Sequence, residues 1–216
     1  MENKKEKLED FKTAISSTVR SLSNSQEIEI SFGNQAIKSS KNSIRLPDLE
    51  QGSNKLNYEK IRAIADSKSL NLRFSDVKTL KKYEPEGNIS KKLYSISEKI
   101  RCEKIGTSYF KGVKKNIEKY YYKRLSGLDL KSSEDKIIES FENYLRVKFL
   151  NFKNESQIDK KLKPFKKDLN DQLKNRINDL KDLALDQEKF NSLVSKMITD
   201  MSLDENVNEE EKRDEE

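Results

Sequence analysis

The chain has 216 residues, of which 38% are charged and 33% are hydrophobic, and its formal net charge is +6. This low apolar share predicts a narrow core between amphipathic helices rather than a large interior. Histidine is absent and Cys102 is the single cysteine, which excludes histidine-based catalysis, imidazole metal ligands, a four-thiolate zinc site and an internal disulfide.

The charge is unevenly distributed along the chain. Residues 204–216 hold eight acidic and two basic side chains, a net charge of −6, which leaves +12 on residues 1–203. A basic body favours an anionic partner such as nucleic acid. Lys outnumbers Arg 35 to 9, however, and an AT-rich genome produces that bias by codon usage alone. We expect a helical domain over residues 1–203 and a disordered acidic tail.

The first residues, MENKKEKLEDFK, lack the apolar segment of a signal peptide. No apolar run reaches the length of a membrane span. A single cysteine fits a reducing compartment. These three features predict a cytoplasmic protein.

The first quarter of the chain predicts a helix, a strand and a loop. Residues 5–22 place apolar side chains at helical spacing, whereas residues 27–32, EIEISF, alternate and predict a half-buried strand. Residues 33–56 are rich in Gly, Ser and Asn and predict a loop. Within it, residues 45–49 form an extended island, because the residue before a proline avoids the α region.

Three helices are predicted in the middle of the chain. Residues 57–75 favour a helix, although alternating apolar residues leave helix and strand both open over residues 70–83. The next two helices are expected at about residues 89–105 and 108–125. Gly106 would be the residue that follows the end of the first of these.

The C-terminal part predicts three more helices. Ser132 and the acids that follow it resemble a helix N-terminus. Pro164 is tolerated best in a first turn, so a long helix is expected there. Its apolar seam extends to Leu180 and is more typical of intramolecular packing than of a dimeric coiled coil. A last helix spans about residues 187–203. The fold class is therefore mostly α, with a small β element near residues 27–32.

Motifs for common chemistry are missing, and a few charged residues stand out instead. There is no G-x-x-x-x-G-K-[ST] loop and no G-x-G-x-x-G motif. Glu98 and Arg101 fit an exposed pair on one helix face, which contributes about 0.2–0.5 kcal/mol. Alternatively, Glu98 and Glu103 hold Arg101 at a corner between two helices. An Arg in a Lys-rich chain indicates a site that needs the planar, forked guanidinium group, which a lysine cannot supply. Cys102 is interpreted as a small buried apolar residue.

The run Tyr120–Arg124, YYYKR, mixes aromatic and basic residues, as do proteins that bind single-stranded nucleic acid. Helical spacing places Tyr120 and Tyr121 on the apolar stripe and leaves Tyr122 exposed. Core packing is therefore the favoured interpretation, and a basic nucleic-acid-binding module is an alternative function.

A series of short motifs carries a family resemblance. They are EIEISF at residues 27–32, RLPDL at 45–49, RAIAD at 62–66, Asp76, PEG at 85–87, Glu98, Arg101, Glu103, Ile105-Gly106, Gly112-Val113 and Asn116. Together they resemble the N-terminal region of CobT, a subunit of the aerobic, ATP-dependent cobaltochelatase. The resemblance covers about residues 8–203, and the block from 98 to 116 is its most specific part.

The resemblance implies a subunit, without its own active site, of the ligase that forms cobalt–nitrogen bonds in hydrogenobyrinic acid a,c-diamide during cobalamin biosynthesis. It implies two partners, an AAA+ ATPase subunit and a large corrin-binding subunit, and no membrane. ATP, Mg and cobalt are then expected on the partners and none of them directly on this chain. The residues marked as structural or partner-facing are Arg45, Arg62, Asp66, Asp76, Glu98, Arg101, Glu103, Gly106, Gly112 and Asn116.

The resemblance also sets expectations about what surrounds this region. In the family, an acidic linker leads to a von Willebrand A-type domain with a D-x-S-x-S metal site, and no such motif occurs in these 216 residues. The chain is thus expected to be half of such a subunit or a shortened relative. Gly112 is expected to permit close helix approach, and the corner at Gly106 to dock the ATPase ring. A stand-alone helical adaptor is the alternative function.

Overall fold

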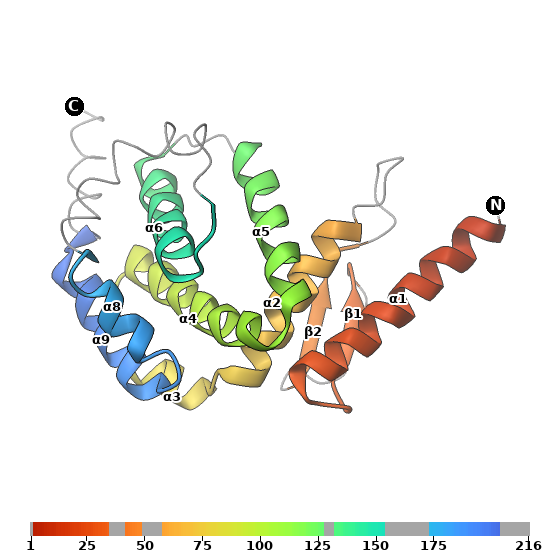
Figure 1. Cartoon of the computed structure of the whole chain (residues 1–216), viewed down its shortest axis with the longest axis horizontal. Helices are drawn as coiled ribbons and strands as arrows, with labels where there is room; N and C mark the ends of the chain where they lie inside the picture. The colour runs from red at the N-terminus through yellow and green to blue at the C-terminus, as the bar shows by residue number, and fades with distance from the viewer. Residues whose placement is uncertain (1, 35–41, 49–57, 128–131, 154–172, 204–216) are drawn as a thin grey trace. The chain divides into compact units, whose positions relative to one another are not determined.

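The computed structural model describes residues 2–34, 42–48, 58–127, 132–153 and 173–203. The chain divides into two compact units: unit 1 comprises Met1–Phe74 and Gly106–Tyr121, and unit 2 comprises Ser75–Ile105 and Tyr122–Glu216. Most described residues are helical and a single small sheet accompanies them (Figure 1), which confirms the predicted fold class. None of the helices in the described part of the chain is long and apolar enough to cross a membrane.

Unit 1 begins with a helix, two strands and a second helix: α1 (Glu2–Ser23), β1 (Glu29–Phe32), β2 (Ser43–Leu46) and α2 (Tyr58–Phe74). The strands are parallel, and Ile30 pairs with Ile44. The predicted strand is thus confirmed. The predicted loop is wrong at β2. This segment is rich in Ser and Asn, and its composition does not reveal that it pairs with β1.

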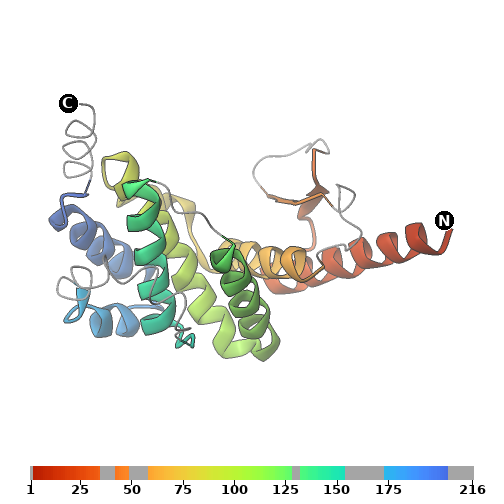
Figure 2. The same cartoon turned by 90° about the horizontal axis from the view of Figure 1, so that it is seen from above.

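The core of unit 1 forms between the sheet and the two helices. Figure 2 shows the strands on one side of α1 and α2. The buried side chains come from all four elements: Leu8, Ile15, Val19, Ile28, Phe32, Ile44, Leu46, Ile61 and Ala65. Two strands by themselves are marginally stable in water, so burial of their apolar faces against the helices is what holds them.

Unit 2 is helical in its described part. It contains α3 (Val77–Lys82), most of α4 (Asn88–Tyr109), the end of α5 (Lys111–Ser126), α6 (Ser133–Phe149), α8 (Ile177–Asp182) and α9 (Gln187–Asp200). Three of these helices begin at a side chain that accepts a hydrogen bond from a backbone N–H in the first turn. The capping residues are Asp76, Ser132 and Asp186, and such caps satisfy donors that the helix itself leaves open.

One choice that the sequence left open is settled by the structure, and two helix boundaries differ from the predictions. Residues 70–74 complete α2 and Asp76 starts α3, so the choice left open over residues 70–83 is settled as helix. The helix predicted to end at Gly106 continues to Tyr109. The helix predicted from Pro164 to Leu180 is interrupted by a turn at residues 174–176. Pro164 itself and the acidic tail lie outside the described residues.

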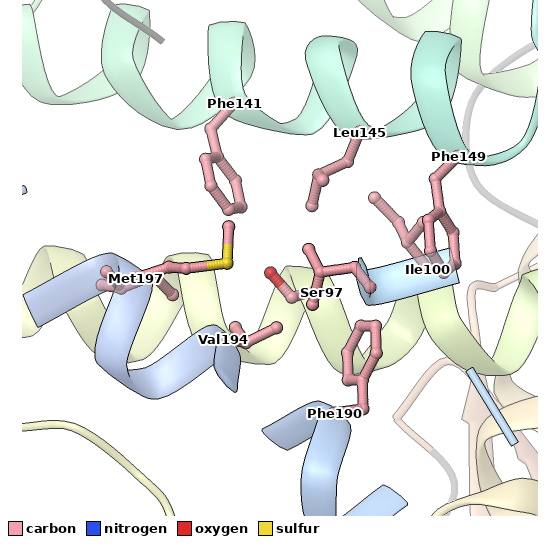
Figure 3. Close-up of a pocket in the computed structure, with 10 residues that line it drawn as sticks. Ser97, Ile100, Phe141, Leu145, Phe149, Phe190, Val194 and Met197 are labelled. Atoms are coloured by element: carbon pink, nitrogen blue, oxygen red, sulfur yellow. The ribbon is translucent and has the colours of Figure 1, made fainter. Parts of the chain in front are cut away.

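The apolar core of unit 2 forms where α4, α6, α8 and α9 meet. Figure 3 shows side chains of α4, α6 and α9 converging on one point, with the Met197 sulfur toward Phe141. Ser97 and Ile100 come from α4, and Phe190 and Val194 from α9. The space between them measures about 10 Å³, about the volume that one water molecule needs. It is therefore a packing defect of the core and no ligand site.

Candidate functional site

The motif residues Glu98 and Arg101 lie on α4 and form a buried ion pair. Both Glu98 and Arg101 are 1% exposed. Arg101 Nε donates to Glu98 Oε2 and Arg101 Nη2 donates to Glu98 Oε1, each at 2.8 Å. Arg101 Nη1 donates to the Ala184 carbonyl oxygen at 2.9 Å, ahead of α9. The arginine thus uses its planar fork on the carboxylate and a third donor to hold the segment that leads into α9.

Glu103 is fully buried and belongs to a second, larger cluster on α4, α5 and α6. Arg146 Nη1 donates to Glu103 Oε2 at 2.6 Å, and Arg146 Nε donates to Glu142 Oε1 at 2.8 Å. Arg124 donates to Glu139 at 2.6 and 2.8 Å and to Glu142 at 2.9 Å. We call these residues, together with Glu98 and Arg101, the arginine–glutamate network.

Charges of opposite sign shift the pKa values of the buried groups of the network. Burial by itself would raise the pKa of the Glu142 carboxyl, but the positive charges of Arg146, Lys99 and Arg124 outweigh burial and hold that pKa at about 2. Burial would likewise lower the pKa of the Arg146 guanidinium, yet Glu103 and Glu142 raise it. Glu142 and Arg146 are therefore both ionised at neutral pH, and each stabilises the charge of the other.

The network corrects one expectation and adds residues that the sequence analysis missed. The interpretation of Glu98 and Arg101 as an exposed pair is wrong, because both are covered by packed helices. Glu103 pairs with Arg146 rather than with Arg101. Arg124, Arg146 and the glutamates of α6 were not predicted. Their signal was available: the arginines are rare in this Lys-rich chain, and Glu139, Glu142 and Arg146 follow one another at helical spacing.

In unit 1 the structure brings together motif residues that are far apart in the sequence. Asn116 Nδ2 on α5 donates to Asp66 Oδ2 on α2 at 2.8 Å. Asp66 is 2% exposed. Burial raises its pKa, against the hydrogen bond from Asn116 and the charge of Arg62, which lower it. This contact joins α2 to α5 across 50 positions of sequence.

The two motif glycines differ in their surroundings. A Cβ added at Gly106 would lie 2.2 Å from Leu70 Cδ2, so this glycine lets α4 pack closely against α2 inside unit 1. A Cβ added at Gly112 would have nothing within 4 Å beyond its own helix backbone. The expected close approach at Gly112 is therefore wrong, and Gly106 is the residue with that role.

The remaining motif residues lie at the surface. Arg62 on α2 is exposed, and Asp76 is the exposed N-cap of α3, where Oδ1 accepts from the Thr79 N–H at 2.7 Å. The Asp76 N–H also donates to Gln187 Oε1 at 2.8 Å, which ties α3 to α9. Arg45 on β2 is exposed beside a cleft of about 490 Å³.

The aromatic residues of α5 are used in packing. Tyr121 is buried, Tyr120 is half-buried, and the Tyr122 hydroxyl donates to the Lys153 carbonyl oxygen. Tyr122 is thus half-buried rather than exposed, and no stacking platform for bases forms here. Cys102 is fully buried and burial raises the pKa of its thiol, so its interpretation as a small apolar residue is confirmed.

The buried charged residues of the network contact one another and the backbone of the chain. Among the residues the structure describes, no group of three or more His, Cys, Asp or Glu side chains is placed to hold a metal ion. The buried glutamates of the network direct oxygens at arginines from other turns and other helices. The network can therefore position helices.

A family described as cobalamin biosynthesis protein CobT matches residues 5–216, which is nearly the whole chain. No solved structure matches the chain.

Proposed function

The chain belongs to the CobT family of cobalamin biosynthesis proteins, and from this premise we propose that it is a non-catalytic subunit of ATP-dependent cobaltochelatase. In this role it assembles or couples the AAA+ ATPase subunit with the large corrin-binding subunit, while cobalt enters hydrogenobyrinic acid a,c-diamide on the latter. The chain contributes to a ligase activity without supplying the reacting groups.

The burial of the arginine–glutamate network is the observation that carries this proposal. Glu98, Arg101 and Glu103 are the most specific part of the family pattern in this chain, and none of them is more than 1% exposed. A side chain without solvent exposure cannot touch a corrin, a cobalt ion or a nucleotide. Glu98, Arg101 and Glu103 therefore hold helices of this chain together. Such a structural role suits a subunit whose task is assembly.

Of the motif set, only the exposed members can be reached by a partner. Arg101 is enclosed, so replacing it would disturb the fold before it disturbed any docking. Arg62 and Gly112 are exposed and both belong to unit 1. Gly112 is the more useful probe, because a large side chain there points into open space and leaves the core untouched.

A pull-down of the AAA+ ATPase subunit by the full 216-residue chain, with and without ATP, tests the proposal. Binding that depends on nucleotide and survives moderate salt is expected, because an assembly contact buries apolar surface and does not rest on screened surface charges. Absence of binding, or binding that vanishes at moderate salt, would contradict the proposal and favour the stand-alone helical adaptor.

Two charge-reversal variants and one bulky variant locate the contact. Arg62→Glu and Gly112→Trp in unit 1 are expected to weaken the complex. Lys148→Glu, an exposed change of the same charge on α6 in unit 2, is the matched control and is expected to leave it intact. Equal loss in Arg62→Glu and Lys148→Glu, with full binding in Gly112→Trp, would show that net charge, and no particular surface, governs the interaction.

A further inference from the structure

We infer that the cleft beside β2 in unit 1 is a binding site for a carboxylate-bearing ligand. The cleft measures about 490 Å³, within the range of about 300–1,000 Å³ that is typical of ligand pockets. It lies at the carboxyl ends of the two parallel strands: Gly33 and Asn34 follow β1, and Pro47 and Asp48 follow β2. Parallel strands commonly present binding groups at this end.

The walls of the cleft are held in place before any ligand arrives. The Gly33 N–H donates to the Leu46 carbonyl oxygen at 2.9 Å. Gly33 has a φ of +60°, and a Cβ there would meet Asp48 Cβ and Cγ at 2.9 Å. Only glycine allows this conformation together with this contact. The two strand ends are therefore joined, and ligand binding need not order them.

Two cationic residues line the cleft from different elements. Arg45 is on β2, Lys68 is on α2, and Lys68 Nζ donates to the Arg45 carbonyl oxygen at 3.0 Å. Both side chains are exposed. Asp48 is the one acid among the lining residues, so the lining carries +1. A single positive charge with an arginine fork suits a monoanionic carboxylate better than a dianionic phosphate.

Apolar side chains form the rest of the lining. Leu46 is 1% exposed and closes the floor, and Pro47 and Ile64 are half-buried at its sides. A ligand that fits has an apolar part next to its carboxylate. Either a free organic acid or an acidic segment of a partner protein meets this description. The shared chemistry is the carboxylate on an apolar stem.

Titration of the full chain alone, followed by amide chemical shifts, tests the inference independently of the proposed function. The probes are hexanoate, the capped pentapeptide LELEL and inorganic phosphate. Shifts at Gly33 and Asn34 with hexanoate would assign the site to free acids, whereas shifts with the peptide alone would assign it to a protein segment. No shift with either carboxylate, or equally tight binding of phosphate, would overturn the inference.

Matched variants connect binding to the two cations. Arg45→Gln and Lys68→Gln are each expected to weaken carboxylate binding by about tenfold or more, since a hydrogen bond to a charged group is lost. Lys115→Gln removes an exposed charge on α5 outside the lining residues and is expected to bind normally. Full affinity in Arg45→Gln, or equal weakening in Lys115→Gln, would overturn the inference. Circular dichroism of each variant checks that the fold is retained.

Discussion

Two buried carboxylates, Asp66 in unit 1 and Glu142 in unit 2, have pKa values displaced in opposite directions. Burial raises the pKa of Asp66, and the hydrogen bond from the neutral amide of Asn116 and the charge of Arg62 oppose this rise only in part. Burial acts on Glu142 in the same sense, but three cations reverse the result and lower its pKa to about 2. Burial sets the cost of a charge, and the neighbouring cations decide the sign of the shift.

The same contrast runs through the described cores of the two units. Apolar side chains from two helices and two strands form the core of unit 1. Unit 2 adds a set of buried arginines and glutamates to its apolar core. Pairing must be complete for such a network to be tolerated, since removal of one partner leaves another charge buried and uncompensated. Unit 2 is therefore expected to respond strongly to charge changes and unit 1 to volume changes.

The largest effect is expected for Arg146→Ala in unit 2. This change leaves Glu103 and Glu142 without their main cation and should lower the free energy of unfolding by about 3–5 kcal/mol. Urea unfolding monitored by circular dichroism measures it. Arg176→Ala is the matched control, because Arg176 forms an exposed pair with Asp200 and its loss should cost less than about 1 kcal/mol. Similar losses in both variants would refute the role of burial.

A second effect is the loss of stability of unit 2 in acid. The folded pKa of Glu142 lies below the ordinary value of 4.5, so its contribution is complete above pH 4.5 and disappears as the pH falls toward 2. The shift corresponds to a contribution on the order of 3 kcal/mol. Unfolding free energies at pH 7, 5 and 3 should fall less steeply in Glu142→Gln than in the native chain. Glu86→Gln, an exposed change, should keep the native slope, and a native slope in Glu142→Gln would contradict the assignment.

A volume effect is expected at the glycines of unit 1. Gly106→Ala forces Leu70 to move and should destabilise by about 1–3 kcal/mol, less the gain in helix propensity. Gly112→Ala adds its methyl group in open space and should stabilise by about 0.5–1 kcal/mol. Thermal and urea unfolding of both variants give the comparison. Leu70→Ala should lower the free energy of unfolding by less in the Gly106→Ala background than in the native chain. Additive effects of the two changes would exclude a clash between the added methyl group and Leu70.

The smallest effect is expected for Asp66→Asn. Because the folded pKa of Asp66 is raised, the native state holds its proton more firmly, and this residue lowers stability as the pH rises through that pKa. Asn at position 66 keeps an acceptor for Asn116 and should change stability at pH 7 by less than about 1 kcal/mol. The variant should also lack the decrease in the free energy of unfolding that the native chain shows as the pH rises above the ordinary pKa of 3.8. Asp10→Asn, an exposed change on α1, is the control and should keep the native pH dependence. If Asp66→Asn also keeps the native decrease in stability, another group is responsible for that decrease.

Local patterns predicted most of the secondary structure. The helical spacing of apolar residues identified α1, α4, α5, α6 and α9, and alternation identified β1. The cap at Ser132 was visible as a serine before acidic residues. These features depend on neighbours within a few positions, so the sequence carries them directly. The family motifs were also legible as short runs, and they indicated CobT before any contact was known.

Tertiary contacts decided the roles of those motif residues. Glu103 could not be assigned to Arg146, which lies 43 positions away, because spacing on one helix identifies only the partners within reach of that helix. Gly106 looked like a helix end, and only the position of Leu70 shows that it is a packing residue. The strand β2 and the cleft at Arg45 depend on a parallel pairing across a Ser- and Asn-rich segment. Sequence alone determined most of the helices and β1. Long-range packing decided β2 and which charges are buried, since pairing and burial depend on residues that are distant along the chain.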